Sequence, residues 1–143
     1  MSRIPRSQEH LKTAFTAEAA SAARFRAYAD RAGRDGLPNV AKAWLRLAAA
    51  KDRLAVALLE AAEEVRGKDT DIAQAVAEER YENDVLYPKM IKDLGQPAAD
   101  ALLEVVAAQK DHLRQLEALR EALGASTGDV GLPVEVDQGA ARG

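Results

Sequence analysis

Two lysines stand in the middle of apolar helical stripes. Lys51 opens the tetrapeptide Lys-Asp-Arg-Leu, and Lys110 opens the similar tetrapeptide Lys-Asp-His-Leu. Around each lysine, apolar residues recur at steps of three and four, which places them on one face of a helix. A lysine on such a face must find a partner or reach solvent, because a lone buried ammonium is costly. The two stripes are Val40, Trp44, Leu47, Lys51, Leu54, Leu58, Ala62 and Val65, and Leu103, Val106, Lys110, Leu113, Leu116, Arg120 and Leu123.

Two further stripes carry glutamates at the corresponding places. They are Leu11, Phe15, Glu18, Ala22 and Phe25, and Ile72, Val76, Glu79, Glu82, Leu86 and Met90. Four helices are therefore predicted to bring charge into the middle of an apolar face. Opposite charges at those positions can pair, which favours the ionised form of each partner.

Composition favours an all-α fold. Hydrophobic residues make up 48% of the 143 residues and aromatic residues only 4%. Alanine, leucine, glutamate and arginine are strong helix formers, whereas residues that favour strands are sparse. The absence of cysteine excludes disulfides, thiolate metal sites and cysteine nucleophiles.

Charge and hydropathy limit the expected partners. A net charge of -3 provides no strong field for nucleic acid or for an anionic membrane. No stretch of 18 apolar residues is present, and residues 1–12 contain no apolar signal core. We therefore expect a cytoplasmic protein that binds neither nucleic acid nor membranes.

Glycine and proline divide the chain into two helical hairpins. Helices are predicted at about 7–32, 38–66, 69–94 and 97–123, with turns at Gly33–Pro38 and at Gly95–Pro97. Pro88 should disturb the third helix near residues 84–87 because it lacks a backbone donor. Two hairpins of equal design predict a four-helix bundle over residues 1–124, followed by an extended or flexible tail over 125–143.

The charges of each hairpin are expected at one level. Glu18 lies about 17 residues before the middle of the first turn and Lys51 about 16 after it. Glu79 lies about 16 residues before the second turn and Lys110 about 14 after it. At the rise of a helix, these differences amount to only a few Å.

Two segments resemble the ferritin-like domain of the rubrerythrin family. In the first helix, Ala14-Phe15, Glu18 and Arg24-Phe25 are similar to the family's Ala-Phe, Glu and Arg-Tyr run. In the third helix, Glu79-Arg80-Tyr81-Glu82 and Tyr87-Pro88 are similar to its Glu-x-Tyr-Glu and Tyr-Pro. The resemblance covers about residues 8–123 and implies a ferritin-like four-helix bundle made of two long helical hairpins.

The chain departs from this family where the family binds iron. The resemblance implies Glu-x-x-His at the centres of the second and fourth helices, where this chain has Lys51 with Leu54 and Lys110 with Leu113. The family's rubredoxin-like module needs four cysteines, and the chain has none. We therefore expect no metal, no cofactor and no catalytic residue, but a metal-free charged core with a structural or interaction role. Its members are Glu18, Lys51, Glu79, Glu82 and Lys110.

Other interpretations stay open at this point. The lysines can instead reach solvent along their apolar stems, and the glutamates can lie on an exposed face. Glu18, Glu79 and Glu82 can also serve a metal-binding protein or a peroxidase-like oxidoreductase. A radical or proton-transfer role for a Glu-Lys-Tyr cluster with Tyr81 or Tyr87 is a further alternative. His112, one residue before Leu113, is not expected to be a ligand. Because the charged core is expected to be buried, Lys51→Ala should cost about 3–5 kcal/mol.

A homodimer with exchanged hairpins is the expected assembly. In the ferritin-like topology the second and third helices run parallel, so their connection must span about 40 Å, whereas four residues reach roughly 14 Å. A plain antiparallel turn would fit the length but would separate the charges by about 10 Å.

In the tail, Val130, Leu132, Val134 and Val136 alternate, which suits an extended segment on a helix groove or on a partner protein; disorder is the alternative.

Overall fold

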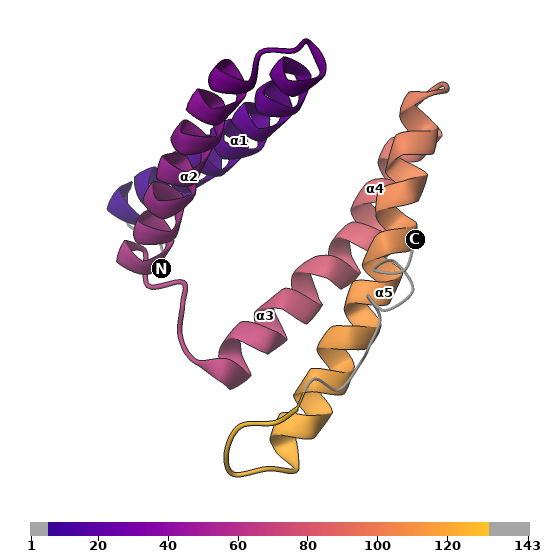
Figure 1. Cartoon of the computed structure of the whole chain (residues 1–143). Coiled ribbons are helices and arrows are strands. Elements are labelled where there is room, and N and C mark those ends of the chain that lie inside the picture. The colour runs from indigo at the N-terminus through magenta and orange to yellow at the C-terminus, as the bar shows by residue number, and fades with distance from the viewer. Residues whose placement is uncertain (1–5, 132–143) are drawn as a thin grey trace. The chain divides into compact units, whose positions relative to one another are not determined.

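The computed structural model describes residues 6–131 and is entirely helical in its regular structure over that range. The elements are α1 (Arg6–Arg34), α2 (Pro38–Ala61), α3 (Lys68–Tyr81), the π-helix η1 (Glu82–Leu86), α4 (Tyr87–Lys92) and α5 (Ala98–Gly124). They form two compact units that divide after Arg66. Figure 1 shows α1 beside α2 in one unit, and the α3–η1–α4 rod beside α5 in the other. The predicted all-α fold with two hairpins is confirmed.

The first unit is an antiparallel hairpin with an alanine seam. The seam consists of the most deeply buried residues of α1 and α2, none more than 6% exposed, and an alanine just beyond α2. They are Ala22, Ala29, Ala32, Ala48, Ala55 and Ala62. Their spacing of about seven residues keeps them on one edge of each helix. Because methyl groups are small, the two backbones can approach closely along this edge.

The ends of this hairpin are fixed by local contacts. At the turn, Gly36 has a φ of 77°, a left-handed conformation that suits glycine, and Pro38 begins α2. At the open end, the Gln8 side chain donates to the carbonyl of Ala62, and Lys12 Nζ lies 3.0 Å from the Glu64 carboxylate. The hydrogen bond from Lys12 lowers the pKa of the Glu64 carboxyl below its usual value.

The second helix ends five residues earlier than the sequence predicted. It ends at Ala61, and Glu63 takes a left-handed φ of 59°. The amide of Glu64 then donates to the carbonyl of Leu59, at 3.1 Å, which closes the last turn. Gly67, with a φ of 121°, precedes α3, and its amide donates to the Asp71 carboxylate at 3.1 Å.

The second unit is a hairpin whose first arm changes helix type. Ile72 and Val76 of α3 are buried within this unit. The disturbance expected before Pro88 takes the form of η1, where the amide of Tyr87 donates to the carbonyl of Glu82. A π-turn shifts the hydrogen-bond pattern just before the proline, which has no amide hydrogen to donate. The arm therefore continues through Pro88.

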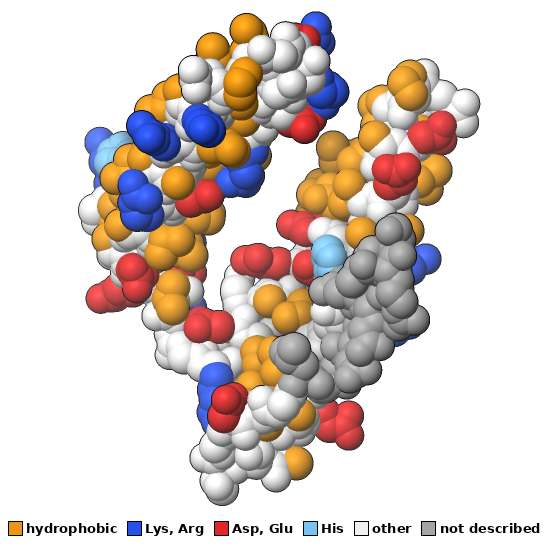
Figure 2. Space-filling model, in the orientation of Figure 1, with side chains coloured by type: hydrophobic (Ala, Val, Ile, Leu, Met, Phe, Trp, Pro, Cys, Tyr) orange, Lys and Arg blue, Asp and Glu red, His pale blue; other side chains and the backbone are white. Residues whose placement is uncertain are grey.

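Bulky apolar residues of α2 lie outside the alanine seam. Val40, Leu47 and Leu54, all on the stripe that contains Lys51, are about half exposed. Figure 2 shows orange hydrophobic side chains on the surface of this hairpin, between charged groups. The seam takes the closest contact with α1, so Val40, Leu47 and Leu54 are left partly uncovered within this unit.

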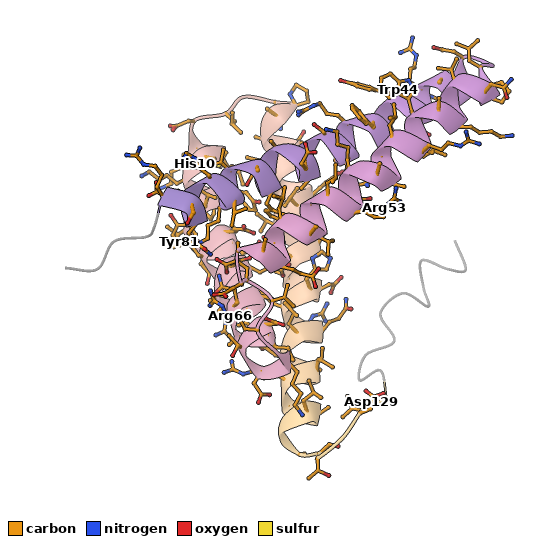
Figure 3. The ribbon with its side chains drawn as sticks, turned by 90° about the vertical axis from the view of Figure 1, so that its left-hand side faces the viewer. His10, Trp44, Arg53, Arg66, Tyr81 and Asp129 are labelled. Atoms are coloured by element: carbon orange, nitrogen blue, oxygen red, sulfur yellow. The ribbon has the colours of Figure 1, made fainter. Side chains whose placement is uncertain are left out.

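Aromatic side chains gather toward the turn of the first hairpin. The ring of Trp44 lies 5.0 Å from those of Phe25 and Tyr28, measured between centroids. Figure 3 shows Trp44 on the part of α2 nearest the turn and Arg53 farther along the same helix. Phe15, Phe25 and Trp44 are half-buried, as is Leu86 in the second unit, so these expected core residues keep some contact with solvent.

Among the described residues, no helix is both long and apolar enough to cross a membrane. Of the alternating tail residues, only Val130 falls in the described range, where it is half-buried. Leu132, Val134 and Val136 lie outside the described residues.

The alanine seam gives a direct test of this packing. Ala48→Leu should lower the free energy of unfolding by about 1–3 kcal/mol, because the larger side chain forces the helices apart. Ala49→Leu, on the exposed neighbouring position of α2, should change it by less than about 0.5 kcal/mol. Urea denaturation followed by circular dichroism measures both. Equal effects of the two substitutions would contradict the seam.

Candidate functional site

Lys51 and Glu18 form an ion pair at the middle of the first hairpin. Lys51 Nζ lies 3.0 Å and 3.1 Å from the two carboxylate oxygens of Glu18. The side chains are 31% and 22% exposed, so the pair is partly shielded from water but not sealed. Lys51 belongs to α2 and Glu18 to α1, so the pair links the two arms. A charge-assisted bond of this kind is stronger than one between neutral groups.

A second ion pair lies on the rim of the same hairpin. Arg26 of α1 lies 2.8 Å from the carboxylate of Asp52, the residue after Lys51. Both side chains are about half exposed, and the contribution of such a pair to stability is small. Lys51 is thus the more shielded cation of the two.

Lys110 does not repeat the arrangement of Lys51. Its side chain is exposed and makes no hydrogen bond or ion pair within residues 6–131. The side chains of α5 that meet the glutamates of the third helix are instead Gln109 and His112. Gln109 Nε2 donates to Glu82 Oε1 at 2.9 Å, and His112 Nδ1 lies 3.5 Å from Glu79 Oε1.

The face of α5 toward the carboxylates therefore differs by one residue from the expected one. Each step along a helix turns the side chain by about 100°, so Gln109 and His112 point elsewhere than Lys110 and Leu113. Leu113 is half-buried, and Leu54, at the corresponding place on α2, is 51% exposed. The spacing Gln-x-x-His is itself a sequence signal that would have identified this face.

Three buried oxygen atoms of the second hairpin lack a hydrogen-bond partner in the described structure. They are Glu79 Oε2, Asn83 Oδ1 and Gln109 Oε1. Asn83 lies in η1 and is only 6% exposed, the one strongly buried polar residue among those described. Asn83 and Gln109 are neutral amides, so a pattern of charged residues on apolar stripes does not identify them.

The other candidates lie at the margin of these contacts. Tyr81 is 57% exposed and Tyr87 half-buried, and His10 is exposed on α1. Arg80 pairs with Glu117 on the outer side of α3 and α5. Over residues 6–131, no three histidine, aspartate or glutamate side chains gather closely enough to hold a metal ion by themselves.

Comparison with known families agrees with the resemblance seen in the sequence. The family model described as Rubrerythrin matches residues 9–120. No curated protein and no solved structure gives a significant match. The family match covers most of the four helical arms and the contacts of Glu18, Glu79 and Glu82. The chain therefore belongs to the rubrerythrin family and carries its ferritin-like domain.

Proposed function

We propose that this rubrerythrin-family protein has lost its di-iron centre and acts as a structural or interaction module. The observation that carries the proposal is the Lys51 ammonium bonded to both oxygens of Glu18. A cation supplied by the chain neutralises a carboxylate that the family resemblance assigns to iron.

The residues present do not fit two iron ions. Iron in such a site needs several carboxylate and imidazole ligands. On α2 the two expected ligand positions hold an ammonium at Lys51 and an aliphatic side chain at Leu54, and neither can donate electrons to a metal. On α5 the expected ligand positions hold Lys110 and Leu113, and the side chain that meets Glu82 is the neutral amide of Gln109. We therefore assign no iron-dependent oxidase or peroxidase step to the protein.

The exposed apolar stripe of α2 supports an interaction role. Val40, Leu47 and Leu54 lie beside the Lys51 pair and have no cover within the hairpin. Monomeric proteins rarely leave a continuous apolar stripe in water. The second hairpin has exposed apolar residues as well, among them Val85, Met90 and Leu103. Pairing between hairpins would remove both surfaces from water.

A dimer with exchanged hairpins satisfies this pairing with the connection available. The segment between α2 and α3 comprises residues 62–67. Six residues span roughly 20 Å, less than the length of the helices that a parallel connection must pass. Exchange between two chains removes that requirement. The C-terminal tail is proposed as a second contact, with a partner protein.

A metal-binding function that uses the remaining carboxylates is the second candidate. The unpartnered oxygens of Glu79, Asn83 and Gln109 favour it.

The two lysines provide a matched test of the ion pair. Lys51→Ala should lower the free energy of unfolding by about 1–2 kcal/mol, because it leaves Glu18 without its charged partner. The 31% exposure of Lys51 reduces this effect below that of a fully buried pair. Lys110→Ala should change stability by less than about 0.5 kcal/mol. Chemical denaturation of both variants measures these free energies of unfolding, and equal decreases in the two variants would contradict the proposal.

Iron stoichiometry tests the loss of the di-iron centre. The unmodified protein, loaded anaerobically with ferrous iron, should retain fewer than two iron ions per chain. The triple variant Lys51→Glu, Leu54→His, Gln109→Glu should retain two, because it restores the family's ligand types on the faces that meet Glu18 and Glu82. The control variant Lys51→Glu, Leu54→His, Lys110→Glu should not, since Lys110 points to solvent. Two irons in the unmodified protein would overturn the proposal.

The length of the connection tests the exchanged dimer. Light scattering should give the mass of a dimer for the unmodified chain. Insertion of about 12 flexible Gly/Ser residues after Arg66 should yield monomers, because the longer connection lets both hairpins pack within one chain. The same insertion after Gly128, beyond α5, should leave the dimer intact. A monomeric unmodified protein, or a dimer insensitive to the first insertion, would exclude hairpin exchange.

A further inference from the structure

The two hairpins carry opposite net charge. Residues 6–66 contain 11 lysines and arginines against 8 aspartates and glutamates, which gives the first hairpin a net charge of +3. Residues 67–131 contain 7 against 13, which gives the second hairpin a net charge of -6. Figure 2 shows lysine and arginine side chains spread over the first hairpin, and aspartate and glutamate side chains over the second. The net charge of the whole chain, -3, does not reveal this division.

Positive charge is concentrated near the turn of the first hairpin. Residues 21–50 contain six lysines and arginines but only two aspartates, Asp30 and Asp35. Asp30 pairs with Arg34 and Asp35 with Arg31, so both aspartates are already engaged by arginines of α1. The part of the hairpin around its turn therefore keeps an excess of positive charge.

Three cations of α2 form a basic stripe, which consists of Lys42, Arg46 and Arg53. Their steps of four and seven residues place them on one face of the helix. All three side chains are exposed, and none makes a hydrogen bond or an ion pair within residues 6–131. Lys51 follows Lys42 by nine residues, which at about 100° per residue puts it on the opposite side of α2. The basic stripe is thus separate from the Lys51–Glu18 pair, and its charge is not compensated.

Negative charge in the second hairpin is shared by both of its arms. Residues 67–96 contain seven aspartates and glutamates against four lysines and arginines, and residues 97–131 contain six against three. Two of these carboxylates, Glu79 and Glu82, meet an imidazole and a neutral amide instead of a lysine or arginine. The acidic character therefore extends along the whole hairpin.

Apolar contact alone would not select which hairpins associate. Both hairpins expose apolar residues, such as Leu47 in the first and Leu103 in the second. Burial of apolar surface has no preferred direction, so two first hairpins could also associate with each other. Charge removes that ambiguity, because like charges repel and opposite charges attract.

We propose that the opposite charges select the partner of each hairpin, so that the basic first hairpin of one chain associates with the acidic second hairpin of another copy. The inference rests on the exchanged dimer of the proposed function, and it adds how unlike hairpins find each other. Both hairpin pairs of an exchanged dimer bring opposite net charges together. Pairs of two first hairpins or of two second hairpins bring like charges together and are disfavoured.

Attraction of this kind acts mainly on the rate of association. Opposite fields steer two proteins toward each other and can raise the rate by about 10- to 1000-fold at low ionic strength. The basic stripe needs no direct contact with the partner for this effect, since the field reaches about 30 Å at about 0.01 M salt. At about 1 M salt it reaches only about 3 Å, so the steering should vanish.

Two triple variants of the full chain test the inference. Refolding from urea at several protein concentrations, followed by the fluorescence of Trp44, the only tryptophan, gives the rate of the concentration-dependent association step. At about 0.01 M salt, Lys42→Gln, Arg46→Gln, Arg53→Gln should slow this step about fivefold or more, because the first hairpin then has no net charge. The control Lys89→Gln, Lys92→Gln, Lys110→Gln makes the second hairpin more acidic and should not slow it.

The two variants differ only in where the charge is removed. Each lowers the net charge of the chain by the same three units, so general repulsion between chains would slow both equally. Slower association of the first variant alone, with all rates converging at about 1 M salt, supports the inference. Equal slowing of both variants, or a rate insensitive to salt, overturns it and leaves the exchanged dimer intact. An unmodified chain that light scattering shows to remain monomeric contradicts the exchanged dimer, and the inference falls with it.

Discussion

The close contact between α1 and α2 along their alanine seam is the constraint on which the first hairpin depends. Because methyl groups fill this contact, the larger side chains of α2 stand to one side of it. The same contact brings Glu18 and Lys51 together across the hairpin. Small residues thus determine both which charges meet and which apolar surface remains for a further partner. A leucine seam would hold the helices farther apart and would weaken that coupling.

Electrostatics explains why a lysine can stand where the family resemblance implies a metal ligand. A carboxylate placed among helices needs a positive charge, and removal of a metal leaves that charge uncompensated. Lys51 supplies a positive charge from within the chain, so we expect this hairpin to fold without metal. The long stem of lysine covers apolar surface while its ammonium reaches Glu18. In the described part of the second hairpin, Glu79 and Glu82 meet an imidazole and an amide instead.

Periodicity and turn chemistry predicted the helices well, because glycine and proline mark the ends of long amphipathic segments. The early end of α2 depends on the left-handed backbone conformation of Glu63. Glutamate rarely adopts this conformation, so no sequence signal predicts it at that position. The Lys51–Glu18 contact has the register that counting from the turn predicted. The same count placed Lys110 at the level of Glu79 along the hairpin. Such a count does not determine which face of α5 carries the Lys110 side chain. The leucine stripe of α5 lies beside polar residues, so the sequence pattern does not determine how α5 is rotated about its own axis.

The rotation of α5 determines which of its side chains stand where the family resemblance implies metal ligands. By sequence position alone, α2 and α5 underwent the same replacement, with Lys-Asp-x-Leu at the centre of each. By contact, the two helices differ: α2 presents an ammonium, whereas α5 presents Gln109 and His112. On the side of α5 that meets the glutamates, a neutral amide and an imidazole stand three residues apart. The Glu18 carboxylate of the first hairpin is therefore neutralised by a lysine, whereas Glu79 and Glu82 of the second meet an imidazole and a neutral amide.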